Sequence, residues 1–149
     1  MSRPKAIPEG YHSIQPYLIF KGAAEAIDFY KRAFGVTERL RMPRPDGAIA
    51  HAELEFGDSC VMLADEAPEI GALSPSHFGG SPVSLMFYVD DCDAVYRQAL
   101  AAGATSNREP TDQPYGDRMA GVKDPFGYSW YLGTHIKDLS KEDLEALKV

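Results

Sequence analysis

The pattern of hydrophobic and polar positions repeats along the chain after roughly 69 residues. Residues 14–20 (IQPYLIF) and 83–89 (VSLMFYV) alternate as strands do, and each is followed by a stretch with helical spacing that ends at a glycine. Farther along, an FG pair precedes CVML in the first half and SWYL in the second. A repeated unit of this kind predicts two similar halves related by a pseudo-twofold axis.

Each half is predicted to contain a strand, a helix and three further strands. The first module covers about residues 13–66, a Pro-, Gly- and Ser-rich linker covers 67–82, and the second module covers about 83–134. A capping-box pattern that begins at Ser140 predicts a C-terminal helix over about 140–148. The predicted fold class is therefore α+β, in a single domain over residues 1–149.

Composition and charge narrow the class of protein. The 149 residues are 44% hydrophobic and 25% charged, a mixture typical of a soluble globular domain. A net charge of -7 with no clustered basic face argues against nucleic acid as a partner. No segment has the apolar length of a signal peptide or a membrane span, so we expect a cytoplasmic protein that does not enter a membrane. Cys60 and Cys92 lack metal or redox spacing and are predicted to be free core thiols.

Three segments resemble a known family. The opening YLIFKGAAEAIDFYKRAFG, the central HAELEFGD and the closing DPFGYSWYLGTH are similar to the vicinal oxygen chelate superfamily, which has the glyoxalase and bleomycin-resistance fold. Within it they look most like the PhnB-like subgroup. The resemblance implies two tandem βαβββ modules that form a curved mixed sheet cup, with helices outside and a pocket inside. It also implies a homodimer.

Strand alternation then assigns side chains to the two faces of each sheet. The helix-facing set is predicted to contain Ile14, Leu18 and Phe20 in the first strand, Ala50, Ala52, Leu54 and Phe56 in the third, and Val83, Leu85, Phe87 and Val89 in the fifth, with Trp130 in the last. The opposite, pocket-facing set contains Gln15, Tyr17 and Ile19, then His51, Glu53 and Glu55, then Ser84, Met86 and Tyr88, together with Met62 and Tyr131.

The predicted pocket is poor in metal ligands. In metal-dependent members the resemblance implies ligands at the positions of Gln15, Met62, Ser84 and Tyr131, and of these only glutamine belongs to the usual ligand set. A thioether and two neutral hydroxyls suit a divalent ion badly, so we expect no cofactor and no metal at this position. A displaced divalent site around Gln15, His51 and Glu53 stays open as an alternative.

The side chains with binding chemistry are mostly aromatic. The predicted substrate-binding set is Gln15, Tyr17, Met62, Ser84, Met86, Tyr88, Arg118 and Tyr131. Arg118 is expected either to grip a ligand carboxylate or phosphate, or to form an ion pair with Asp117, Asp124 or Glu53. His135 is expected to make a structural hydrogen bond.

Three functions follow as hypotheses. The first is a binding or sequestering protein of the glyoxalase/bleomycin-resistance type that holds a partly apolar small molecule. The second is an enzyme, a lyase, isomerase or dioxygenase, with His51 and Glu53 as candidate catalytic residues, using the displaced metal or Glu53 as a general base. The third is an interaction module whose cups are filled by its own side chains.

Overall fold

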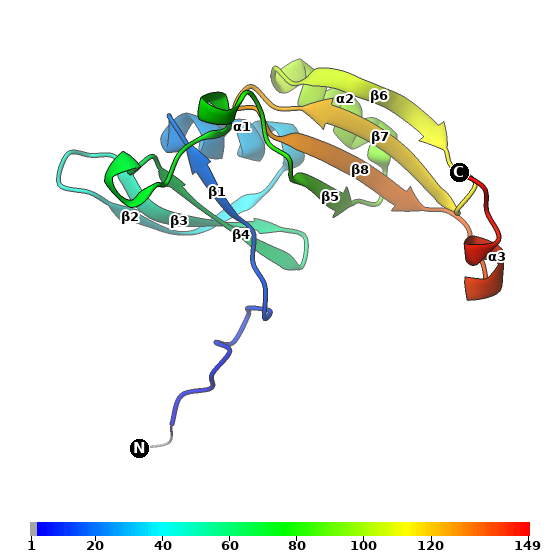
Figure 1. Ribbon diagram of the computed structural model, residues 1–149, viewed down its shortest axis with the longest axis horizontal. Helices are drawn as coiled ribbons and strands as arrows, with labels where there is room; N and C mark the ends of the chain where they lie inside the picture. The colour runs from blue at the N-terminus through cyan, green and yellow to red at the C-terminus, as the bar shows by residue number, and fades with distance from the viewer. Residues whose placement is uncertain (1–2) are drawn as a thin grey trace.

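A computed structural model describes residues 3–149 and contains two four-stranded sheets that lie side by side, each with a helix (Figure 1). The first module consists of β1 (Tyr17–Phe20), α1 (Ala23–Phe34), β2 (Thr37–Pro43), β3 (Ile49–Phe56) and β4 (Ser59–Asp65). The second consists of β5 (Ser84–Tyr88), α2 (Cys92–Ala102), β6 (Thr105–Asp112), β7 (Asp117–Lys123) and β8 (Ser129–His135). This is the predicted α+β arrangement of two βαβββ modules.

The two sheets have the same strand order. They run β1-β4-β3-β2 and β5-β8-β7-β6, with the first and last strand of each module parallel and the other pairs antiparallel. Tyr17 lies opposite Met62 in the first sheet, and Met86 lies opposite Tyr131 in the second. The register therefore confirms the internal repeat.

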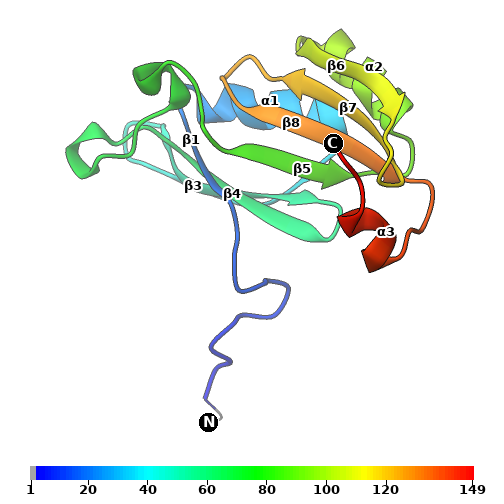
Figure 2. The same ribbon diagram turned by 45° about the vertical axis from the view of Figure 1, so that its right-hand side comes forward.

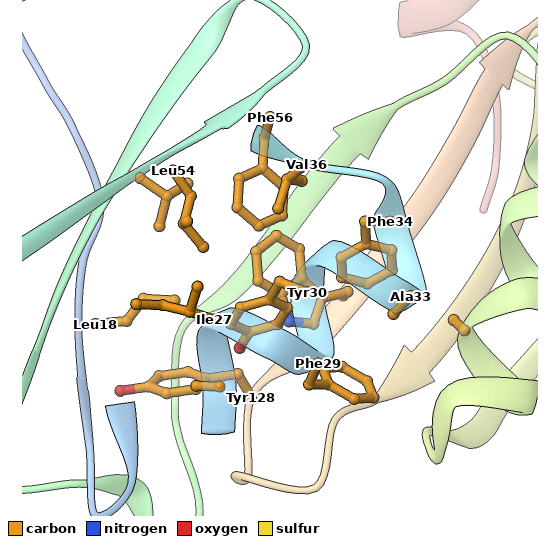
Figure 3. Packing of buried hydrophobic residues seen from close by; sticks show 14 of the residues in the cluster. Leu18, Ile27, Phe29, Tyr30, Ala33, Phe34, Val36, Leu54, Phe56 and Tyr128 are labelled. Atoms are coloured by element: carbon orange, nitrogen blue, oxygen red, sulfur yellow. The ribbon is translucent and has the colours of Figure 1, made fainter. Parts of the chain in front are cut away.

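One hydrophobic core lies between the helices and the sheets and draws on both modules (Figure 3). Tyr30 of α1 is 1% exposed and meets Trp130 of β8 edge to face, with ring centroids 5.3 Å apart. The Trp130 ring stacks on Phe56 of β3 at 5.0 Å. Because α1 packs on α2 and these aromatic contacts cross between modules, neither sheet buries its helix face alone. Trp130 is 2% exposed, which confirms its predicted place in the core.

A buried carboxylate holds the turn between β7 and β8. Asp124 Oδ1 accepts hydrogen bonds from the backbone N–H groups of Phe126 at 2.9 Å and Tyr128 at 3.0 Å. Its Oδ2 accepts from Trp130 Nε1 at 2.9 Å and from the Tyr30 hydroxyl. Burial raises the pKa of Asp124, although these four hydrogen bonds favour the ionised form.

The predicted faces of the central strands are confirmed, with three corrections. Leu18 and Phe20 are buried, but Ile14 is 86% exposed because β1 begins only at Tyr17, after Pro16. Val83 is 63% exposed and precedes β5. Ala50 is exposed because of a register shift between β2 and β3. Met42 pairs with His51 and the next residue, Pro43, pairs with Ile49, so Ala50 is an extra residue without a partner in β2.

The segments outside the modules are irregular or short. Residues 3–16 form an N-terminal arm without helix or strand, whose first part extends away from the sheets (Figures 1 and 2). The linker contains two short 3-10 turns, η1 (Pro68–Ile70) and η2 (Pro75–Phe78). The C-terminal helix α3 (Lys141–Glu145) is shorter than predicted, and Ser140 caps it as expected. No helix within residues 3–149 is both long and apolar enough to cross a bilayer.

Candidate functional site

A cavity of ligand size lies between the modules, where the β3–β4 turn of the first module approaches β5 of the second. Its volume is about 430 Å³. The β3–β4 hairpin supplies one wall, β5 supplies the other, Trp130 contributes from β8, and the end of the N-terminal arm borders it. The residues that line it are His12, Ile14, Pro16, Phe56, Gly57, Asp58, Ser59, Cys60, Val61, Leu85, Met86, Phe87, Tyr88 and Trp130. The wall is mostly apolar, with a few hydrogen-bonding groups.

A chain of hydrogen bonds lies on the first sheet, on the side away from the helix. The Tyr17 hydroxyl is 2.7 Å from His51 Nδ1, and His51 Nε2 is 3.0 Å from Glu53 Oε1. The Tyr11 hydroxyl, from the N-terminal arm, donates to Glu53 Oε2 at 2.5 Å. Cys60 Sγ lies 3.8 Å from the same oxygen and also lines the cavity. The structure thus brings together the two predicted catalytic candidates, neither of which lines the cavity, and Glu53 contacts its wall through Cys60.

The electrostatics of Glu53 follow from these contacts. Glu53 is 4% exposed, and burial alone would raise the pKa of its carboxyl group. The hydrogen bonds from His51 and Tyr11 outweigh burial and hold the pKa of Glu53 below its usual range. The hydrogen bond to Glu53 and burial raise the pKa of Tyr11, so the proton stays on the phenol. Glu53 is therefore a carboxylate whose two oxygens are both engaged.

The second sheet carries a different set of groups on the corresponding face. Met86 and Tyr131 lie opposite each other and are 42% and 40% exposed. The Tyr88 hydroxyl donates to Asp117 Oδ2 at 2.7 Å, and His135 Nδ1 is 2.7 Å from Asp117 Oδ1. Hydrogen bonds to Asp117 and Asp138 raise the pKa of His135. His135 thus makes the structural hydrogen bond expected from the sequence.

The remaining predicted binding residues are spread over the two modules. Gln15 lies in the arm, where its Oε1 accepts a hydrogen bond from the His12 backbone at 2.7 Å. Met62 is half-buried opposite Tyr17, and Ser84 is exposed at the start of β5. Of the whole predicted set, Met86 and Tyr88 line the cavity.

Arg118 has partners that the sequence did not indicate. Its Nε and Nη2 bind the two carboxylate oxygens of Asp93 at 2.7 and 3.0 Å, and its Nη1 binds Asp112 at 2.9 Å. The predicted partners Asp117, Asp124 and Glu53 are engaged elsewhere. The Arg118 guanidinium holds the pKa of Asp93 down to about 2. Because three of its nitrogens are already paired, Arg118 ties β7 to α2 rather than reaching for a ligand.

The donor set does not fit a divalent cation. The four positions that the family resemblance implies supply an amide, a thioether and two hydroxyls. The amide oxygen of Gln15 already accepts a hydrogen bond from the backbone N–H of His12. Among residues 3–149 no three His, Cys, Asp or Glu side chains converge as they would around a metal ion. Within the described residues His51 and Glu53 are a pair without a third ligand of this kind, which is too few protein ligands for a zinc-type site.

Tyr11 and Cys60 were missed by sequence reasoning. Tyr11 precedes the first strand in a segment with no periodicity, and only the folded arm brings it to Glu53. Cys60 was assigned to the core, and it is indeed a free, buried thiol. The short turn between β3 and β4 could have indicated the contact with Glu53. In this hairpin Glu55 pairs with Cys60, which places Cys60 close to Glu53 on the neighbouring strand.

Comparisons of the sequence and of the structure with known proteins point to the same family. Residues 12–132 match the model of the Glyoxalase/Bleomycin resistance protein/Dioxygenase superfamily. The uncharacterized protein Rv0887c of Mycobacterium tuberculosis is 39% identical over 137 residues, which cover 90% of this chain and 81% of that protein. The crystal structure of TioX from Micromonospora sp. ML1 is similar with a TM-score of 0.66 and 27% identity over 87% of this chain and 100% of that one. A PhnB protein from Bacillus cereus shares the fold, with a TM-score of 0.62 and 21% identity over 83% and 99% of the two chains.

Proposed function

Because the chain belongs to the Glyoxalase/Bleomycin resistance protein/Dioxygenase superfamily, we propose that it binds or sequesters a small, partly apolar molecule. The cavity between the modules carries this proposal. Its volume of about 430 Å³ falls within the range of about 300–1,000 Å³ that is typical of small-molecule sites. Aromatic and aliphatic side chains form most of its wall, and Ser59, Cys60 and the free edge of β5 supply polar contacts. The cavity lies between the modules and not inside one sheet cup, which is where the sequence predicted the pocket.

Binding without turnover is favoured by the state of Glu53. A general base needs a free lone pair aimed at substrate and a pKa near the working pH. Both Glu53 oxygens instead accept hydrogen bonds inside the protein, and its pKa is lowered. The carboxylate therefore serves better to fix Tyr11 and His51 than to take a proton.

The single tryptophan makes the proposal testable. Trp130 lines the cavity, so a bound molecule should change its fluorescence. We expect hits from a library of partly apolar compounds to shift this fluorescence and to raise the melting temperature. Met86→Ala should weaken their binding, whereas Met42→Ala should not, because Met42 is a similarly exposed methionine outside the cavity. Equal binding by both variants, or no hits at all, would contradict the proposal.

An enzyme with Glu53 as general base is the second candidate. The observation in its favour is that Glu53 is buried and contacts Cys60, which lines the cavity. On this hypothesis a ligand that displaces Tyr11 would free one carboxylate oxygen. Glu53→Gln should then abolish turnover of a bound compound while its affinity stays within a few-fold. Unchanged turnover in Glu53→Gln would exclude this role.

A second copy of the chain is part of the same proposal. Tyr17, Met86, Tyr88 and Tyr131 leave between 40% and 58% of their surface exposed on the faces away from the helices. Large apolar side chains that are exposed on these sheet faces favour burial against a partner. Light scattering should give twice the mass of one chain, and Tyr131→Lys should shift the equilibrium toward the monomer. A monomer at all concentrations would contradict the dimer.

A further inference from the structure

The two modules differ at one pair of positions that the internal repeat makes equivalent. In the second module Tyr128 follows the β7–β8 turn, and its backbone carbonyl accepts a hydrogen bond from Asp124 N–H at 2.9 Å. In the first module Ser59 takes the same place after the β3–β4 turn, opposite Phe56. The equivalence follows from the register, since Cys60 pairs with Glu55 as Ser129 pairs with Lys123. A tyrosine in one half is therefore a serine in the other.

Tyr128 closes the free edge of β1. Its hydroxyl donates to the Ile19 carbonyl at 2.9 Å and accepts from the Ile19 N–H at 3.1 Å. The Tyr128 ring packs edge to face on Phe20, with centroids 5.3 Å apart, and the residue is 8% exposed. One phenol thus satisfies both edge-facing backbone groups of Ile19 and fills the space beside the strand.

The equivalent edge of β5 has no such group. Tyr88 is the counterpart of Ile19, because Ile19 lies opposite Ala64 and Tyr88 lies opposite Gly133 in the two parallel ladders. The Val89 N–H donates to Gly133 of β8, and backbone groups alternate in direction along a strand, so the N–H and C=O of Tyr88 face the free edge. Within residues 3–149 no side chain hydrogen-bonds to them, and the Ser59 hydroxyl turns to Asp58 at 3.0 Å.

The cavity lies where the missing tyrosine would be. Ser59 and Tyr88 both line it, together with Phe56, Val61 and Trp130. We infer that this cavity takes a hydroxylated aromatic ring, whose hydroxyl donates to the Tyr88 carbonyl and accepts from the Tyr88 N–H as Tyr128 does at Ile19. This inference rests on the proposed function and specifies its ligand class. A hydroxyl group that both donates and accepts is the recognition element, and the apolar wall holds the ring.

The first test uses 4-methylphenol, which reproduces a tyrosine side chain beyond Cα. Its matched control is 4-methylanisole, which has the same ring and an oxygen that accepts but cannot donate. In ¹⁵N-labelled protein, 4-methylphenol should shift the backbone amide resonance of Tyr88 and bind about tenfold more tightly than 4-methylanisole, since one hydrogen bond is lost and a carbonyl is left unpaired. Equal affinities, or a Tyr88 amide that does not move at saturation, would overturn the inference.

The second test builds the ligand into the chain. Ser59→Tyr should place a phenol in the cavity, remove 4-methylphenol binding and shift the Tyr88 amide without any ligand. Ser59→Phe is the matched control, because it adds the ring without the hydroxyl. We expect Ser59→Tyr to melt roughly 4–8 °C higher than Ser59→Phe, the effect of the two hydrogen bonds that the hydroxyl would make in a chain of this size. Wild-type affinity for 4-methylphenol in Ser59→Tyr would place the binding elsewhere and overturn the inference.

The two proposals fail in different ways. If apolar compounds without a hydroxyl bind as well as phenols and Met86→Ala weakens both, the cavity is a binding site but the ligand class is wrong. If 4-methylphenol shifts no resonance of any residue that lines the cavity, the ligand class is overturned at this site. The loss of all binding across the compound library would remove the proposed function as well.

Discussion

Replacing Asp124 tests how much of the stability depends on one buried carboxylate. Asp124 is 4% exposed and accepts four hydrogen bonds, two from the backbone of its own turn and two from the side chains of Tyr30 and Trp130. Those two side chains are 1% and 2% exposed, so water cannot replace the lost acceptor. Asp124→Ala therefore leaves two buried side-chain donors unpaired and loosens the turn that carries Tyr128.

The expected cost can be worked from these contacts. An unsatisfied buried donor costs about 1–3 kcal/mol, and breaking a buried charged network costs about 3–5 kcal/mol. We therefore expect Asp124→Ala to lower the free energy of unfolding by about 3–5 kcal/mol, a large part of the roughly 5–15 kcal/mol that stabilises a typical domain. The melting temperature should fall by roughly 6–20 °C for a chain of this size. Tyr30→Phe removes one donor and leaves the acceptor satisfied, so it should cost less.

A double-mutant cycle isolates the side-chain contact. Asp124→Asn keeps the oxygen that accepts from the turn. The new NH₂ group then replaces the oxygen that accepts from Trp130 Nε1, so two hydrogen-bond donors face each other. Trp130→Phe removes that conflict, so the double variant should be more stable than the sum of the single effects predicts, by about 1–2 kcal/mol. Urea denaturation, followed by circular dichroism, measures each corner of the cycle. A cost below about 1 kcal/mol for Asp124→Ala, or purely additive effects, would refute this account.

Two further predictions concern the turn before β7 and the end of β8. Gly116 has φ +96°, and an added Cβ would lie 2.2 Å from the Lys137 carbonyl oxygen. Gly116→Ala should therefore destabilise the folded protein by about 1–3 kcal/mol, measured in thermal melts. Gly35→Ala, at φ +66° with open space around it, should cost less, and equal costs would contradict the steric argument. For His135, the raised pKa means that its stabilising effect is present below pH 6.5 and is lost as the pH rises through the pKa of the folded protein. Asp117→Asn should lower that pKa in an NMR titration, and an unchanged value would show that Asp117 is not the cause.

The extent to which the sequence predicted the fold can be judged from particular strands. Leu18, Leu54 and Trp130 are buried as alternation requires, because each lies in a regular strand against a helix. Ala50 breaks the rule because the β2–β3 pairing contains an extra residue, which depends on the partner strand and is invisible in local alternation. Ile14 fails for a different reason, since β1 begins only at Tyr17 and Ile14 therefore lies outside the strand that its apolar pattern suggests.

The candidate site was predicted less completely than the fold. The pairing of His51 with Glu53 follows from their spacing of two residues on one strand, and the structure confirms that they contact each other. The contact of Tyr11 with Glu53 joins residues far apart in the chain, which no local pattern encodes. Arg118 binds Asp93 and Asp112 instead of the three predicted acids, because α2 and β6 place those two carboxylates within hydrogen-bonding distance of its guanidinium.

The sequence by itself determined the repeated strand and helix units and the faces of most strands, because these depend on residues that are neighbours along the chain. The repeat even pairs Ser59 with Tyr128. Only the tertiary structure decided what that difference means, since it shows that Tyr128 fills the edge of β1 while the cavity lies at the edge of β5. Hydrogen bonds and cavities depend on which distant groups converge, and that is fixed only when both modules pack on one core.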